Sequence, residues 1–177
     1  MKILVTGGTG YIGSVTIRKL LEAGHEVSVF DNVERGHRES MAPGVPLVVG
    51  DLRDAEAIRT AVRDIRPDAV MHFAAYALVG ESMRQPELYF RNNVVGGCNL
   101  LDAMREYGVT LTKLDDVKDA DCVIVAVAHN EFRALSLNDI KALFRKDSVD
   151  NEKVLIDVKG LYKIADLNAS GMKWWRL

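Results

Sequence analysis

The chain has 177 residues, of which 48% are hydrophobic and 27% are charged, the balance of an ordinary globular protein. Its formal net charge is −2 and it has no cluster of Lys and Arg, which argues against nucleic acid or an anionic membrane as the main partner. No apolar run approaches the roughly 20 residues of a membrane span, and the N-terminus has the pattern of a strand, not of a signal peptide. Cys98 and Cys122 form no C-x-x-C pair, so we expect a cytoplasmic protein with reduced thiols and no metal site.

Short apolar runs alternate with helical patterns along the chain. Strands are predicted at 2–6, 26–31, 47–50, 69–73, 122–127, 153–158 and 172–176, and helices at 12–23, 55–65, 86–107, 137–144 and 164–168. The strands are nearly continuous apolar runs, which is typical of a parallel sheet covered on both faces. We therefore expect one α/β domain over residues 1–177, a Rossmann-like three-layer α/β/α fold. Its doubly wound, mostly parallel sheet has six or seven strands in the order 3-2-1-4-5-6, with any seventh strand at the edge.

Three glycines, Gly7, Gly10 and Gly13, lie between the first strand and the first helix. The first permits a tight turn, the second lets the backbone approach a pyrophosphate, and the third lets helix and strand pack closely. The start of the helix offers free N–H groups and a partial positive charge to the phosphates. Backbone contacts to a dinucleotide are expected there from Thr9, Tyr11 and Ile12.

Two acidic residues follow the second and third strands. Asp31 stands 24 residues after Gly7, where a carboxylate accepts both ribose hydroxyls and repels a 2′-phosphate, so NAD is favoured over NADP. Asp51 can accept a hydrogen bond from the adenine amino group, with Leu52 against the ring. Alternatively, Asp51 forms a turn or a helix cap, although Asp54 is the better cap for the helix that begins at residue 55.

Small residues end the fourth strand in the string Phe73-Ala74-Ala75. They let a cofactor lie against the backbone at the point where the strand order reverses. Simple close packing explains the same residues equally well.

A set of strings in residues 1–109 carries a family resemblance: KILVTGGTGYIGS, VFDN, GDLRD, HFAA, VGES and YFRNNV. This part resembles the N-terminal, NAD-binding part of the UDP-glucose 4-epimerases, which are extended short-chain dehydrogenases/reductases. The resemblance implies NAD as cofactor, a nucleotide-sugar as a candidate second ligand, and either a monomer or a homodimer paired through the segment 86–107. It implies cofactor contacts at Tyr11, Ile12, Asp31, Asn32, Asp51, Leu52, Phe73, Ala74, Ala75 and Asn92.

The catalytic residues of that family have no counterpart in this sequence. Its members carry a Tyr-x-x-x-Lys pair, and none of the five tyrosines here is followed by Lys four positions later. Ala77 also stands where the family often has Lys. The sugar-binding half of an epimerase is not matched either, so we predict no catalytic residue.

Residues 110–177 carry a second resemblance through the strings DADCVIVAVAHNEF, VLIDVKG and WWRL. They resemble the C-terminal end of the UDP-N-acetylhexosamine 6-dehydrogenases, a nucleotide-sugar dehydrogenase family. Basic residues also change here, from 10 Arg and 2 Lys in residues 1–109 to 3 Arg and 8 Lys in residues 110–177. Together these features predict an engineered chimera of two nucleotide-sugar enzymes, with a natural gene fusion as the alternative origin.

Three functions remain open from the sequence. The first is an NAD(H)-binding Rossmann domain with little or no catalytic activity. The second is a truncated UDP-sugar epimerase or oxidoreductase in which His129, just past the fifth strand, replaces the missing tyrosine as acid or base. The third is a designed recombination of Rossmann fragments without any ligand. Lys159 follows the sixth strand and could meet a phosphate or carboxylate, although both residues could equally be strand-end residues with nothing to act on.

Overall fold

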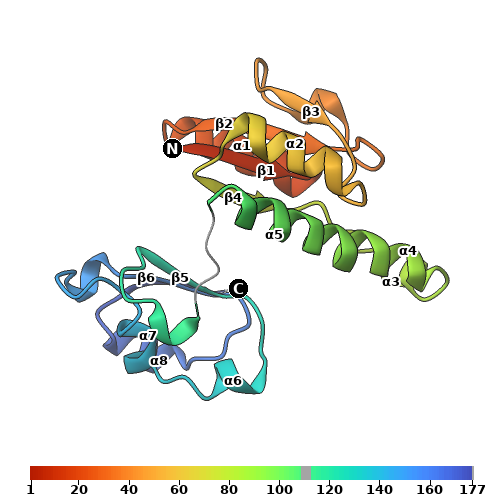
Figure 1. Cartoon of the computed structure of the whole chain (residues 1–177). Coiled ribbons are helices and arrows are strands. Elements are labelled where there is room, and N and C mark those ends of the chain that lie inside the picture. The colour runs from red at the N-terminus through yellow and green to blue at the C-terminus, as the bar shows by residue number, and fades with distance from the viewer. Residues whose placement is uncertain (109–112, 177) are drawn as a thin grey trace. The chain divides into compact units, whose positions relative to one another are not determined.

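The computed structural model describes residues 1–108 and 113–176 and divides the chain into two compact units. Unit 1 is Met1–Leu111 and unit 2 is Thr112–Leu177. Each unit contains its own parallel sheet, with strand order β3-β2-β1-β4 in unit 1 and β5-β6-β7 in unit 2 (Figure 1). The expected sequence of strands is thus found as two sheets, where we predicted one sheet of six or seven strands. Apolar runs predict which segments become strands, but they do not specify which strands pair.

The elements of unit 1 agree closely with those predicted. The strands are β1 (Lys2–Thr6), β2 (Glu26–Asp31), β3 (Leu47–Val49) and β4 (Ala69–His72). The helices are α1 (Tyr11–Glu22), α2 (Ala55–Ile65), α3 (Val79–Ser82), α4 (Pro86–Tyr89) and α5 (Gly96–Glu106), with a 3-10 turn at Arg38–Ser40. A π-helical segment, Phe90–Val95, joins α4 to α5, so the long predicted helix is present with a wider turn inside it.

The sheet of unit 1 is covered on both faces, as its apolar strands predict. Alternate residues of β1 point to opposite sides, with Leu4 in one core and Ile3 and Val5 in the other. Helices α2 and α5 pack side by side on the Leu4 face, and α1 packs on the opposite face through Ile17 (Figure 1). This is the doubly wound, Rossmann-like arrangement.

Helix α1 meets the sheet through Gly13, Ser14 and Ile17, which are buried, and Leu20 packs against the same core. Ile12 and Val15 are exposed, although both are apolar. Gly13 therefore lies on the buried face of the helix, where it closely approaches the preceding loop.

Two predicted helix boundaries in unit 1 are confirmed. Asp54 caps α2, since its carboxylate accepts hydrogen bonds from the backbone amides of Glu56 and Ala57. Gly108 follows the end of α5 with a φ of +104°, a conformation that favours glycine. The boundary between the two segments with different family resemblances, after residue 109, lies outside the described residues.

Unit 2 is smaller and is built around the sheet β5 (Cys122–Val125), β6 (Val154–Asp157) and β7 (Lys173–Arg176). Its helices are α6 (Asn130–Arg133), α7 (Leu137–Lys141) and α8 (Ile164–Ala169), with 3-10 turns at Leu114–Asp116 and Asp150–Glu152. A separate core forms from Val125, Ile140, Phe144, Leu155, Leu167 and Met172. Helix α7 begins with a capping box between Ser136 and Asp139.

The described residues also bear on disulfides, membrane spans and metal sites. Cys98 and Cys122 are free thiols, both exposed. Over residues 1–108 and 113–176, no helix has the length and apolar character to cross a membrane. Within the same ranges, no group of three or more His, Cys, Asp and Glu side chains gathers as metal ligands would.

Candidate functional site

The glycine loop between β1 and α1 forms a tight backbone cradle. Gly7 has a φ of +75°, and a Cβ atom there would lie 2.5 Å from the backbone nitrogen of Ala74. A Cβ atom on Gly13 would lie 2.2 Å from the carbonyl oxygen of Gly7. Neither position tolerates a side chain, so the loop, the start of α1 and the end of β4 are held at backbone contact. These are the close approaches that the glycine spacing predicts.

A cavity that is partly open to solvent lies beside this loop at the carboxyl ends of β1, β2 and β4. Of the 14 residues predicted to contact the cofactor, nine line this cavity: Gly7, Gly10, Asp31, Asn32, Leu52, Phe73, Ala74, Ala75 and Asn92. Five further lining residues were not predicted: Phe30, Arg35, Gly36, Gly50 and Tyr76. All of them belong to unit 1, so the cavity is complete within one compact unit.

Asp31 is buried at the end of β2 and is fixed by the backbone. Its Oδ2 accepts a hydrogen bond from the Thr9 amide at 3.0 Å, and its Oδ1 accepts one from the Val33 amide at 2.8 Å. An ionised carboxylate has about four acceptor positions, so each oxygen keeps one for a ligand hydroxyl. The cavity therefore contains a rigidly held double acceptor.

Thr9 differs from its expected role at the phosphates. Its side chain is buried and its amide N–H is already donated to Asp31, so this backbone group is not free for a phosphate. Tyr11 and Ile12, at the first turn of α1, are 85% and 62% exposed. The start of α1 thus presents Tyr11 and Ile12 to solvent, while Thr9 stabilises the loop through its hydrogen bond to Asp31.

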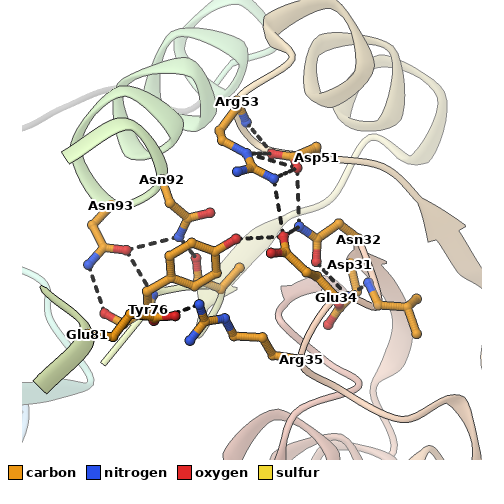
Figure 2. Close-up of polar contacts among 12 residues, drawn as sticks. Asp31, Asn32, Glu34, Arg35, Asp51, Arg53, Tyr76, Glu81, Asn92 and Asn93 are labelled. Atoms are coloured by element: carbon orange, nitrogen blue, oxygen red, sulfur yellow. Dashed lines mark hydrogen bonds and ion pairs between the residues drawn. The ribbon is translucent and has the colours of Figure 1, made fainter. Parts of the chain in front are cut away.

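Asp51 lies outside the cavity lining and is engaged by protein groups (Figure 2). The Arg53 guanidinium donates to both of its carboxylate oxygens, and Asn32 Nδ2 donates to Oδ2 at 3.2 Å. Hydrogen bonding to Arg53 is the main cause that lowers the pKa of Asp51 to about 2. Asp51 therefore orients Asn32, which does line the cavity, and its expected contact with adenine stays a prediction.

Glu34 connects three loops beside the cavity (Figure 2). Its Oε2 accepts hydrogen bonds from Asn32 Nδ2 at 3.2 Å, from Arg53 Nη2 at 3.2 Å and from Tyr76 Oη at 2.6 Å. These donors follow β2, β3 and β4 respectively. One carboxylate oxygen thus ties together the loops at the carboxyl ends of three strands.

Tyr76 is buried at the cavity wall, and its backbone is held by an asparagine. Asn93 Oδ1 accepts from the Tyr76 amide at 2.8 Å, and Asn93 Nδ2 donates to the Tyr76 carbonyl at 2.9 Å. The neighbouring Asn92 donates to the Ala74 carbonyl at 3.2 Å from the π-helical segment. The wider helical turn therefore directs two consecutive amides toward the segment after β4.

Two candidate residues lie in unit 2. His129 and Lys159 follow β5 and β6, two adjacent parallel strands, and both are exposed. The His129 ring lies 6.2 Å from the Phe132 ring. Both residues follow the carboxyl ends of their strands, but these strands form a separate sheet from that of the glycine loop, where one shared sheet was expected. A chemical role for either residue stays a prediction.

The charged residues around Asp31 and Asp51 were not predicted as part of the site. Glu34 and Arg35 lie just after Asp31-Asn32, and Arg53 lies two residues after Asp51. Their closeness in sequence to these two aspartates was the one signal that could have identified them. Their pairing across three loops depends on tertiary placement, which the sequence pattern does not provide.

Comparison with known proteins agrees with this geometry. The model of the NAD dependent epimerase/dehydratase family matches residues 3–115. The UDP-glucose 4-epimerase of Lactobacillus helveticus is 46% identical over 109 residues, which cover 62% of this chain and 33% of that protein. The Streptomyces lividans UDP-glucose 4-epimerase is 48% identical over 109 residues, which cover 61% of this chain and 33% of that protein.

Solved structures of UDP-glucose 4-epimerases are also similar to this chain. The Brucella ovis UDP-glucose 4-epimerase in complex with NAD is 42% identical with a TM-score of 0.58, and the match covers 60% of this chain and 32% of that one. The Thermus thermophilus UDP-glucose 4-epimerase complex with NAD is 30% identical with a TM-score of 0.61, covering 99% and 54% of the two chains. The chain thus spans about a third of the length of the curated relatives it matches. The comparisons give no support to a dehydrogenase-like segment or a chimera.

Proposed function

This chain belongs to the NAD dependent epimerase/dehydratase family, and on that premise we propose that unit 1 binds NAD in the cavity beside the glycine loop. The observation that carries this proposal is the Asp31 carboxylate, which two backbone amides fix in the same cavity that Gly7 and Gly10 line. A rigid double acceptor beside a side-chain-free backbone cradle matches a ribose next to a pyrophosphate. The similar structures from Brucella ovis and Thermus thermophilus are complexes with NAD, which supports the same assignment.

Different residues of the chain bind different parts of the cofactor. Gly7, Gly10 and the exposed first turn of α1 receive the pyrophosphate, with Tyr11 and Ile12 presenting backbone N–H groups. Asp31 accepts the adenosine ribose hydroxyls, and Leu52 provides an apolar wall for the base. When bound, NAD supplies a hydride acceptor, and unit 1 holds and orients it.

A finer proposal concerns the substrate. We infer that the chain is a cofactor-binding portion of a UDP-sugar epimerase-type enzyme, since UDP-glucose 4-epimerases are among its relatives. Its sequence lacks a Tyr-x-x-x-Lys pair, so we expect little or no turnover by this chain alone. Alternatively, the chain is active and His129 is the proton-transfer group. An assay of UDP-glucose or UDP-galactose conversion with added NAD separates these hypotheses: no conversion by the wild type supports the first, and conversion that His129→Ala abolishes supports the second.

The origin of the chain and its domain organisation are further proposals. The change from Arg-rich to Lys-rich composition after residue 109 supports a chimera of two nucleotide-sugar enzymes. That residues 1–177 fold as one Rossmann-like domain, in a cytoplasmic setting, stays a prediction beside the two compact units of the structure. Thermal unfolding tests it: a single cooperative transition indicates one domain, and two separate transitions indicate two.

A homodimer is proposed from an apolar helical face. Phe90, Val94 and Leu101 are exposed on the continuous helical segment from the π-helical turn into α5, at spacings of four and seven residues. This spacing aligns them on one face. Sedimentation should show a dimer that Phe90→Ser/Leu101→Ser converts to a monomer, and a monomeric wild type would contradict the proposal.

Ligand-dependent thermal unfolding tests the NAD proposal. A ligand that binds the native state raises its stability by about 2.7 kcal/mol at a hundredfold excess over Kd. NAD and ADP-ribose should both raise the unfolding midpoint, because both contain the adenosine and pyrophosphate parts that unit 1 receives. Nicotinamide mononucleotide should raise it much less. Equal shifts with all three ligands would contradict the assignment of unit 1 to the adenosine half.

A further inference from the structure

Two side chains with opposite preferences for a dinucleotide line the same cavity. A carboxylate after the second strand binds the ribose 2′-hydroxyl of NAD, whereas a nearby arginine accommodates the 2′-phosphate of NADP. Asp31 and Arg35 are only four positions apart, and both line the cavity. The cofactor preference of this site therefore depends on whether Arg35 is available to a phosphate.

Arg35 is held by groups other than a ligand (Figure 2). Its Nη2 lies 2.7 Å from Glu81 Oε2, and its Cζ lies 3.9 Å from the centroid of the Tyr76 ring. The two charged side chains are 34% and 24% exposed, so the pair is partly shielded from water. A carboxylate partner and a cation–π contact together fix the guanidinium on the cavity wall.

Glu81 is itself positioned by a third residue. It comes from α3, lies outside the cavity lining, and accepts a hydrogen bond from Tyr89 Oη at 2.6 Å. The other arginine of this region, Arg53, is engaged by Asp51 and Glu34. Both guanidinium groups beside the cavity thus already have carboxylate partners.

We propose that Glu81 determines cofactor specificity in this site, because it holds Arg35 against Tyr76 and thereby withholds the guanidinium from a 2′-phosphate. Asp31 disfavours the phosphate directly, and Glu81 neutralises the residue that would otherwise attract it. The inference rests on the proposed NAD site and adds to it a residue that does not touch the cofactor. Loss of the Glu81 charge leaves Arg35 on the cavity wall, free to pair with a phosphate.

The test compares NAD⁺ and NADP⁺ by calorimetric titration of the full chain. Glu81→Gln keeps the size of the side chain and an oxygen that accepts from Tyr89, but removes the charge that holds Arg35. We expect the Kd for NADP⁺, relative to that for NAD⁺, to fall by about tenfold, on the order of one charge-assisted hydrogen bond. Adding Arg35→Ala to Glu81→Gln should abolish the gain. Glu81→Ala provides a second variant with the same expected direction.

Two further variants separate specificity from general structure. Tyr89→Phe removes a hydrogen bond that positions Glu81, so the Kd for NADP⁺ relative to that for NAD⁺ should fall in the same direction as in Glu81→Gln, but by less. Glu87→Gln is the control, since it removes an exposed carboxylate from α4 and should leave the ratio unchanged. A wild type that binds neither dinucleotide overturns the proposed function. NAD⁺ binding with an unchanged ratio in both Glu81 variants overturns the specificity inference alone.

Discussion

The backbone amide of Thr9 donates a 3.0 Å hydrogen bond to Oδ2 of Asp31, and this bond joins the glycine loop to the end of β2. The carboxylate is thereby both a structural partner of the loop and an acceptor in the cavity. Its second oxygen is fixed in the same way by the Val33 amide. The orientation of Asp31 is therefore set before any ligand arrives, which lowers the entropy lost on binding.

Asp31→Asn should weaken NAD binding by about tenfold or more, because hydrogen bonds to a charged group contribute about 1.5–3 kcal/mol. The amide nitrogen of Asn donates and does not accept, so at least one ribose hydroxyl loses its partner. Calorimetric titration measures the change. Asp64→Asn on α2 is the matched control, since this exposed carboxylate pairs with Arg63 away from the cavity. An unchanged NAD affinity in Asp31→Asn would place the ribose elsewhere.

Gly13→Ala should destabilise unit 1 by at least about 1–3 kcal/mol, since its Cβ would lie 2.2 Å from the Gly7 carbonyl oxygen. The loop must move to make room, so NAD affinity should fall as well. Gly97→Ala is the control, because a Cβ at this helical position meets nothing within 4 Å. That variant should gain about 0.5–1 kcal/mol. Thermal unfolding compares the two, and equal midpoints would refute the close packing of the loop.

Protonation of Asp51 should make unit 1 less stable at low pH. Its pKa is lowered from the ordinary 3.8 to about 2 in the folded state, so its contribution is complete above pH 3.8 and is lost as pH falls through 2. The pair with Arg53 is partly exposed, which limits that contribution to about 1 kcal/mol or less. Urea unfolding of the wild type and Asp51→Asn from pH 5 to pH 2 should show a stability gap that closes. A constant gap would contradict the ion pair.

Glu34 and Tyr76 should act as one unit in binding the adenosine half. Glu34→Gln and Tyr76→Phe each weaken the link between loops, and the double variant should bind ADP-ribose no worse than the weaker single variant. Residues in direct contact commonly show coupling of about 0.5–3 kcal/mol. Glu39→Gln, a carboxylate in the following 3-10 turn, is the control and should bind as the wild type does. Strictly additive effects in the double variant would argue against the link.

The fold was largely predictable because each strand and helix of unit 1 is specified locally. The apolar run at β1, the Asp54 cap and the Gly108 stop each coincide with a boundary in the structure. The pairing of strands was less predictable. The expected single sheet is present as two sheets, because apolar strands of equal character do not specify their neighbours.

The site was predictable where backbone geometry dictates the residue type. Gly7, Gly13 and Asp31 lie where the spacing places them, and the structure gives each a steric or hydrogen-bonding reason. The exception is the polar network of Glu34 and Arg35. Their partners are Tyr76, from the segment after β4, and Glu81, from α3, both more than one strand further along the chain. Such partners are set by tertiary packing, so only the structure identifies them.

The most direct test of the NAD site is a calorimetric titration of the full chain with NAD. We predict saturable binding with one molecule of NAD per chain, and competition by ADP-ribose for the same site. An absence of any binding at millimolar NAD, with the protein shown to be folded by circular dichroism, would contradict the proposal that unit 1 is a dinucleotide-binding domain.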